Sequence, residues 1–172
     1  MNELKEYIIA FKGLSVGEHI FHFQVTQKFF EAMQSPDIYP TDIQVNLKLD
    51  YRPGLMTFYM EGSGKITFPC DRCLEEFDFP ISYNRTVVYK TGEAEGDDDD
   101  VIFISPNDSQ VDISQLIYDD ILTSIPIRKV HPLNEDGTDS CNPEQIAFLE
   151  KQSSQKPVDH RWDALKDLKF DD

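Results

Sequence analysis

The stretch IQVNLKL, residues 43–49, alternates apolar and polar side chains at every position. In an extended strand Ile43, Val45, Leu47 and Leu49 point to one face, and the polar residues between them point to the other. This period of two predicts a β-strand with one face buried in a core and one face in water.

Similar segments lie on both sides of this strand. Alternating or β-rich sequence is found at residues 7–11, 19–25, 55–60, 65–68, 76–90 and 101–104. Gly62-Ser63-Gly64 separates two of these segments, and such a pair of glycines predicts a turn or a bulge. We therefore expect an antiparallel sheet over residues 5–104, arranged as a meander or as a partly closed barrel.

One strong helical pattern follows the sheet. Apolar residues spaced for one face of a helix predict a main helix over residues 112–125, which Pro126 ends; they are Ile113, Leu116, Ile117, Ile121 and Leu122. Asp119 and Asp120 fall outside this stripe and are expected on the solvent side. Strands followed by a helix indicate an α+β fold.

The sequence of residues 142–172 predicts a helical tail. Asn142 is a favoured N-cap, and Pro143 fits the first position of a helix. Trp162 heads a second apolar stripe, in a segment too short to be stable alone in water. We expect a single α+β domain over residues 1–141, with an N-terminal extension at 1–40 and an acidic loop at 92–100. A loosely attached helical tail occupies residues 142–172.

The charge of the chain is strongly negative and unevenly placed. Of the net charge of −16, residues 91–126 supply ten acidic residues and no Lys or Arg. Such a segment repels nucleic-acid phosphates and attracts a basic protein. A run of like charge is also typical of a merely solvated loop. The candidate partner-binding residues here are Asp97, Asp98, Asp99, Asp100, Asp119 and Asp120, and Trp162 in the tail is another.

A second candidate site lies in CDRCLEEF, residues 70–77, at the expected turn between two strands. Cys70 and Cys73 have the spacing of half a zinc site, and His131 with Cys141 would complete a four-ligand set. Two alternatives stay open, a redox pair at Cys70–Cys73 and buried thiols without a metal. Asp71 and Arg72, between the two cysteines, are candidate partner contacts at the exposed tip of the turn.

Other protein classes find little support in the sequence. It has no run of 18 apolar residues, and its N-terminus does not have the pattern of a signal peptide. We expect a cytoplasmic protein with reduced cysteines. No nucleophile elbow, phosphate-binding loop or dinucleotide fingerprint is present in the sequence, so no catalytic residue is predicted.

Several of these segments together resemble a known family. CDRCLEEF, the acidic segment, DISQLIYDDILTSIP at residues 112–126, the following His-Pro with a later Cys, and DHRWDALKDL at residues 159–168 look like the large ribosomal RNA subunit accumulation protein family, the YceD family. The resemblance covers roughly residues 43–170. His160 stands where the tail pattern of the family usually has Pro.

The resemblance implies a role in the synthesis, processing or stability of large-subunit ribosomal RNA, linked with a small basic ribosomal protein. It marks Cys70, Arg72, Cys73 and Leu74 as signature positions without assigning them a role. The main hypothesis is therefore a non-enzymatic factor that binds a basic large-subunit ribosomal protein or a precursor particle, with direct RNA contact secondary. The alternative is a metal- or redox-dependent enzyme acting on RNA.

Overall fold

The computed structural model describes residues 3–37, 39–92 and 101–154, and every structural statement below refers to these ranges. The chain forms two compact units. The first contains residues 1–69 and 76–129, and the second contains residues 70–75 and 130–172. The expected division of the chain at residue 141 stays a prediction.

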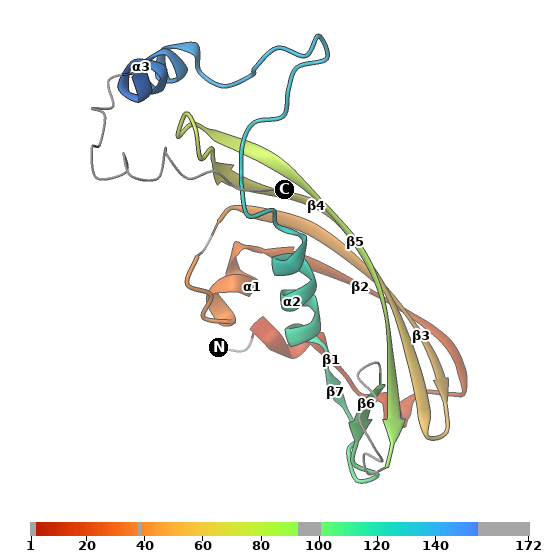
Figure 1. Ribbon diagram of the computed structural model, residues 1–172. Coiled ribbons are helices and arrows are strands. Elements are labelled where there is room, and N and C mark those ends of the chain that lie inside the picture. Colours follow the sequence, from red (N-terminus) through yellow and green to blue (C-terminus); the bar gives the residue numbers. More distant parts are fainter. Residues whose placement is uncertain (1–2, 38, 93–100, 155–172) are drawn as a thin grey trace, which may run out of the picture. The chain divides into compact units, whose positions relative to one another are not determined.

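The first unit is built on a five-stranded sheet (Figure 1). Its strands, in spatial order, are β2 (Gly17–Thr26), β3 (Thr41–Arg52), β4 (Leu55–Pro69), β5 (Glu76–Thr91) and β6 (Val101–Ile104). A separate antiparallel pair joins β1 (Ile8–Ile9) to β7 (Val111–Asp112). The remaining elements of this unit are the 3-10 helices η1 (Glu3–Tyr7) and η2 (Phe11–Gly13) and the helices α1 (Gln27–Ala32) and α2 (Ser114–Ser124). The α+β class is thus confirmed, and the five-stranded sheet is mixed and is not a closed barrel.

One strand runs opposite to the expected direction. Strands β2 to β5 pair antiparallel, but β6 pairs parallel with β5, with Val88 opposite Val101 and Thr91 opposite Ile104. The prediction of an antiparallel strand at 101–104 was therefore wrong. An alternating sequence shows which residues lie on each face of a sheet, but it does not show the direction of the strand. Parallel and antiparallel strands have the same period of two. The connection between β5 and β6 is nine residues long, which is more than a tight hairpin turn needs.

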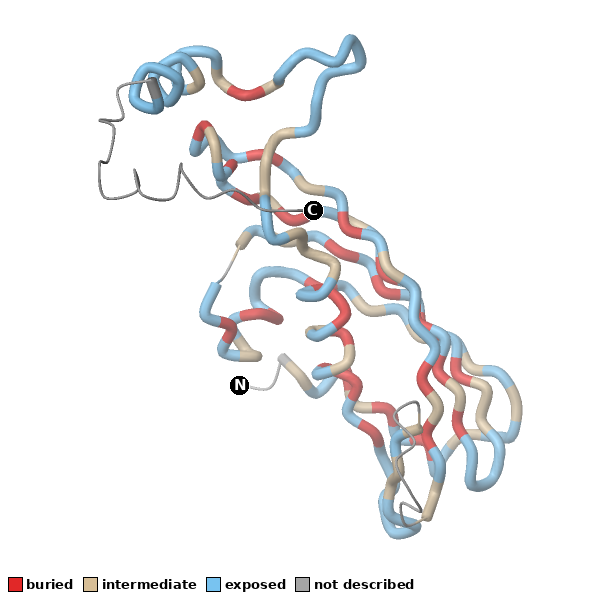
Figure 2. Tube along the Cα trace, viewed as in Figure 1, coloured by how far each residue is buried: buried red, intermediate tan, exposed pale blue. Residues whose placement is uncertain are grey.

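The core of this unit lies on one face of the sheet. Ile43, Val45, Leu47 and Leu49 of β3 are fully buried, as the alternation predicts. Both α1 and α2 lie on the same side of the sheet in Figure 1, and in Figure 2 buried positions alternate along the strands. Three fully buried isoleucines cover this face: Ile117 and Ile121 of α2, and Ile113, which directly precedes the helix. Burial of such side chains stabilises a domain by about 1.5–3 kcal/mol each.

The Gly62-Ser63-Gly64 segment is neither a turn nor a break. Strand β4 continues through it, with Gly62 opposite Tyr83 of β5 and Gly64 opposite Ile43 of β3. The prediction of a turn or a bulge there was wrong, because these glycines allow close packing of neighbouring strands instead. A Cβ on Gly62 would lie 2.1 Å from the Tyr83 ring, and one on Gly64 would lie 2.1 Å from the Asp42 carbonyl oxygen.

We expect Gly64→Ala to destabilise the first unit by about 1–3 kcal/mol, because the new methyl group would overlap main-chain atoms of β3 that cannot rotate away. Ser63→Ala is the matched control, since Ser63 is exposed on the other face of the same strand. Chemical denaturation of both variants measures the difference. Equal stability of the two variants would show that β3 accommodates the methyl group without cost.

The second unit contains the turn at residues 70–75, the segment from Val130 to Asn142 and α3 (Pro143–Ser154). The helix starts where Asn142-Pro143 predicts it. The Asn142 side-chain oxygen accepts a hydrogen bond from the Glu144 N–H at 2.9 Å, which is an N-cap contact. No helix in the described ranges is long and apolar enough to cross a membrane.

Candidate metal centre

The turn after β4 holds the first two candidate ligands. The Cys70 N–H donates to the Glu75 carbonyl, and the Leu74 N–H donates to the Cys70 carbonyl, both at 2.9 Å. Leu74 adopts a φ of 63°, a left-handed conformation that is uncommon for a residue with a side chain. These contacts fold residues 70–75 into a tight loop in which Cys70 and Cys73 are both buried.

The segment before α3 supplies the other two candidate ligands. His131 is half-buried and Cys141 is buried, with 5% of its surface exposed. Cys141 directly precedes the N-cap of α3, where the positive end of the helix dipole favours a thiolate. A short turn closes the intervening chain, with the Asn134 N–H donating to the Thr138 carbonyl at 2.9 Å.

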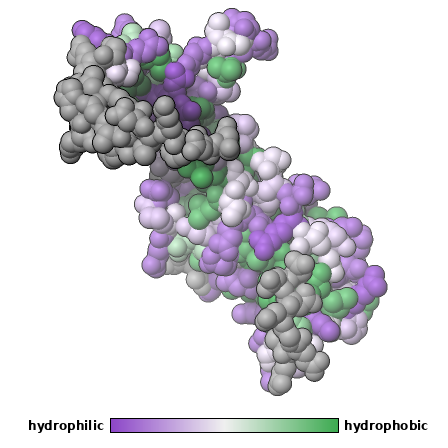
Figure 3. All heavy atoms as spheres, viewed as in Figure 1, coloured by the Kyte–Doolittle hydropathy of each residue, from purple (hydrophilic) through white to green (hydrophobic). Residues whose placement is uncertain are grey.

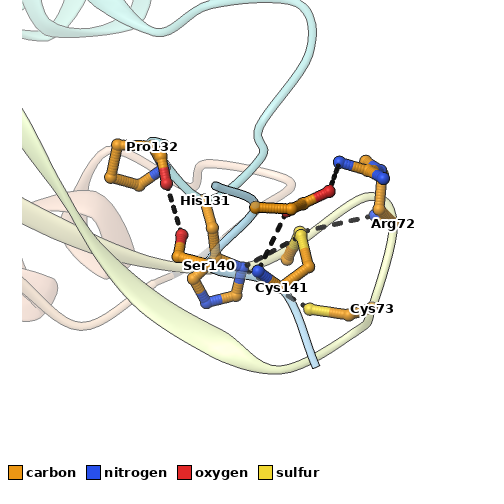
Figure 4. A network of polar contacts seen from close by, with 8 residues as sticks. Arg72, Cys73, His131, Pro132, Ser140 and Cys141 are labelled. Carbon is orange, nitrogen blue, oxygen red and sulfur yellow. Dashed lines mark hydrogen bonds and ion pairs between the residues drawn. The ribbon is translucent and has the colours of Figure 1, made fainter. Parts of the chain in front are cut away.

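All four side chains lie close together, and Figure 4 shows Cys73, His131 and Cys141 side by side. One ligand atom from each of Cys70, Cys73, His131 and Cys141 lies within 4.8 Å of all the others. The Cys70 and Cys141 sulfurs are 3.7 Å apart. His131 Nδ1 is 3.4 Å from the Cys73 sulfur and 3.7 Å from the Cys141 sulfur.

These separations fit a tetrahedral metal site. Zinc–sulfur bonds of about 2.3 Å and zinc–nitrogen bonds of about 2.0 Å place neighbouring ligand atoms about 3.5–3.8 Å apart. Three of the six separations are 3.4–3.7 Å and match edges of that tetrahedron, and the others do not exceed 4.8 Å. The same sulfurs are too far apart for a disulfide bond of about 2.05 Å, and all three cysteines are free. The cluster could therefore hold a metal ion.

The thiols of the cluster differ in their readiness to ionise. Burial raises the pKa of Cys70, but hydrogen bonds from the backbone of Cys73, Arg72 and His131 outweigh it and lower that pKa to about 6. Burial and the neighbouring Asp139 and Cys70 raise the pKa of Cys141 to about 12. Hydrogen bonds to the Cys70 sulfur thus favour its ionised form, whereas burial favours the neutral form of Cys141.

The structure separates the expected partner residues. Asp71 and Asp119 are exposed, and Arg72 forms an ion pair with Asp139. Asp120 is only 7% exposed, and its Oδ1 lies 2.6 Å from Nη1 of Arg85. The expectation that Asp120 faces solvent was wrong, because α2 turns this carboxylate toward the inner face of β5. The other candidates, Asp97, Asp98, Asp99, Asp100 and Trp162, lie outside the described residues.

Two residues of the cluster surroundings were not identified from the sequence. Asp139 Oδ1 accepts a hydrogen bond from the Cys141 N–H at 3.0 Å, and Glu75 Oε1 accepts one from the Asn142 side chain at 2.6 Å. An Asp two residues before a candidate ligand is a recognisable signal, since such a side chain commonly caps the N–H two positions later. No local sequence pattern indicates the contact of Glu75, because its partner Asn142 lies 67 residues away in the chain.

The fold and the cluster define an α+β protein with a Cys3His cluster that could hold a metal ion. In a comparison with protein families, residues 58–169 match the family described as large ribosomal RNA subunit accumulation protein YceD. The match spans about two thirds of the chain and includes all four cluster residues, so the chain belongs to this family. Searches of curated proteins and of solved structures gave no match.

Proposed function

We propose that this protein is a non-enzymatic cytoplasmic factor for large ribosomal subunit biogenesis, and that it supports the synthesis, processing or stability of large-subunit ribosomal RNA. Membership of a family described by large-subunit RNA accumulation carries the ribosomal part of the proposal. The convergence of Cys70, Cys73, His131 and Cys141 supports the non-enzymatic part.

In this proposal the cluster holds a structural zinc ion. Three thiolates and one imidazole fill the four positions of a tetrahedron, which is typical of structural zinc. Catalytic zinc sites keep one position open for water or substrate, and here the protein itself supplies four ligands. Bound zinc would join the turn at 70–75 to the segment at 130–142 and so order the second unit.

The partner proposed for the acidic segment is a basic ribosomal protein or a protein-rich face of a precursor particle. The charge of −16 favours such a partner over exposed RNA. Two arginines that could otherwise contact RNA phosphates, Arg72 and Arg85, are each paired with an aspartate. On the face shown in Figure 3, hydrophilic residues predominate and hydrophobic ones lie between them in small groups.

Depletion of the protein tests the proposal, with ribosomal subunits resolved on sucrose gradients. We expect less free large subunit, less large-subunit RNA and more of its precursor. Restoring the wild-type chain should reverse these changes, whereas a chain with Asp97–Asp100 changed to Asn should rescue poorly. The same change should weaken association with precursors, because it removes four charges that attract a basic partner. Added salt should weaken the association of the wild type as well, because it screens such charges over a Debye length of about 10 Å at 0.1 M. Normal subunit and precursor levels on depletion would overturn the proposal.

A further inference from the structure

We infer that Arg72 and Asp139 form a positioning pair that aligns the two halves of the metal site. The inference rests on the zinc site proposed above and gives a role to the arginine within the C-x-R-C signature. The pair bridges the turn that carries Cys70 and the segment that carries Cys141, which are 71 positions apart in the sequence.

Each member of the pair also contacts a candidate ligand residue. The Arg72 backbone N–H donates to the Cys70 sulfur at 3.5 Å, and the Cys141 backbone N–H donates to Asp139 Oδ1 at 3.0 Å. The Arg72 guanidinium forms an ion pair with Asp139 Oδ2. Since the Cys70 and Cys141 sulfurs are 3.7 Å apart, these contacts close a ring through both candidate ligands.

The charge of the loaded site explains why a cation belongs here. Three thiolates and one neutral imidazole around a divalent zinc carry a net charge of about −1. The Arg72 guanidinium can offset part of that charge. Asp139 alone would repel the thiolates, so its carboxylate is tolerated beside Cys141 because Arg72 neutralises it. Both side chains are about one-third exposed, so solvent screens the pair only in part.

A competing role for Arg72 is direct contact with a phosphate or a ribosomal partner. The geometry favours positioning, because the guanidinium already binds a carboxylate that is itself fixed by the Cys141 N–H. Contacts of this kind around metal ligands commonly change metal affinity 10- to 100-fold when removed. Partner contact and positioning therefore differ in what they predict for zinc affinity measured in the isolated protein.

The test compares zinc affinities of full-length variants by competition with a chelator. Arg72→Met should bind zinc about 10- to 100-fold more weakly than the wild type, and Arg72→Lys should lie between them. Asp139→Asn keeps an oxygen that can accept from the Cys141 N–H but removes the charge, so a smaller loss is expected. The double variant Arg72→Met with Asp139→Asn should bind no more weakly than Arg72→Met alone, because either change breaks the same pair.

Arg52→Met is the matched control, because Arg52 pairs with Asp50 within the first unit. It should leave zinc affinity unchanged. The absorption bands of the cobalt-substituted protein should show whether Arg72→Met disturbs the tetrahedral geometry or only weakens binding. Wild-type zinc affinity in Arg72→Met, with loss of precursor association, would overturn the inference and make Arg72 a partner contact. A wild-type protein that binds no zinc would overturn it as well.

The outcome is separable from the ribosomal proposal, because zinc affinity is measured without ribosomes. If Arg72→Met weakens zinc binding while depletion leaves ribosomal subunits normal, the positioning pair stands and the proposed function fails. If depletion impairs the large subunit while Arg72→Met retains full zinc affinity, the proposed function stands and the pair fails.

Discussion

Protein purified without chelator and without a metal-binding affinity tag is expected to contain one zinc ion per chain. Four buried or half-buried candidate ligand residues already lie with their ligand atoms within 4.8 Å of one another, so only a small contraction is needed to reach zinc distances. Structural zinc contributes about 10–16 kcal/mol of apparent binding free energy in small metal-dependent folds. Elemental analysis together with native mass spectrometry measures the metal content.

Removal of the zinc should affect the two units differently. The second unit surrounds the cluster with short loops and one helix, and two of the apolar side chains of that helix, Phe148 and Leu149, are exposed. The first unit has its own buried core. Hydrogen exchange should therefore accelerate over residues 130–154 on chelation and stay slow in β3 and β4.

His131→Ala and His22→Ala make a matched pair for this prediction. His131 belongs to the cluster, whereas His22 is an exposed residue of β2 that contacts the Asn46 side chain at 2.6 Å. Loss of a ligand should weaken zinc binding more than the roughly 10- to 100-fold typical of outer contacts. His22→Ala should bind zinc as the wild type does. Equal zinc content of the two variants would rule out His131 as a ligand.

Arg85→Met is expected to lower the free energy of unfolding by about 3 kcal/mol at neutral pH. Arg85 engages Oδ1 of Asp120, and the other carboxylate oxygen of Asp120 is buried without a hydrogen-bond partner among the described residues. Loss of the guanidinium leaves a nearly buried carboxylate uncompensated, which is among the costliest single changes in a domain. Arg52→Met removes an exposed ion pair and should cost about 0–1 kcal/mol.

The loss caused by Arg85→Met should shrink as the pH falls. Burial raises the pKa of Asp120 above its usual range, and Arg85 lowers it by a smaller amount. A carboxyl group whose pKa is higher in the folded than in the unfolded protein favours folding when protonated, and this contribution is lost as the pH rises through the folded pKa. Without Arg85 the folded pKa rises further, so the deficit is largest at pH 7 and fades toward the unfolded value of about 3.9.

Denaturation of the wild type and of Arg85→Met at pH 7 and at pH 4.5 measures this effect. Asp120→Asn provides the complementary variant, because it removes the buried charge while Arg85 stays 42% exposed and can be solvated. Asp120→Asn should therefore cost less than Arg85→Met at pH 7. A deficit of Arg85→Met that does not change with pH would show that lost packing, rather than an uncompensated charge, causes it.

Much of the local structure follows from the sequence because its signals are local. Alternation at residues 43–49 assigned the buried face of β3, and Asn142-Pro143 fixed the start of α3. Cys70, Cys73, His131 and Cys141 were grouped from residue type and spacing, and their side chains do converge. Propensity, capping and ligand chemistry act over a few residues or depend on residue type alone, so they are readable without coordinates.

Only the tertiary structure decided which distant residues meet. Pairing in the sheet set the parallel direction of β6 and kept β4 continuous through Gly62 and Gly64, where the close approach of neighbouring strands excludes a side chain. Packing of α2 on β5 turned Asp120 inward to Arg85, and the approach of residues 130–142 to the turn at 70–75 paired Asp139 with Arg72. The sequence determined the buried face of β3, the N-cap of α3 and the residue types of the candidate ligands. Partners across the chain depend on strand register and packing, which no local pattern encodes.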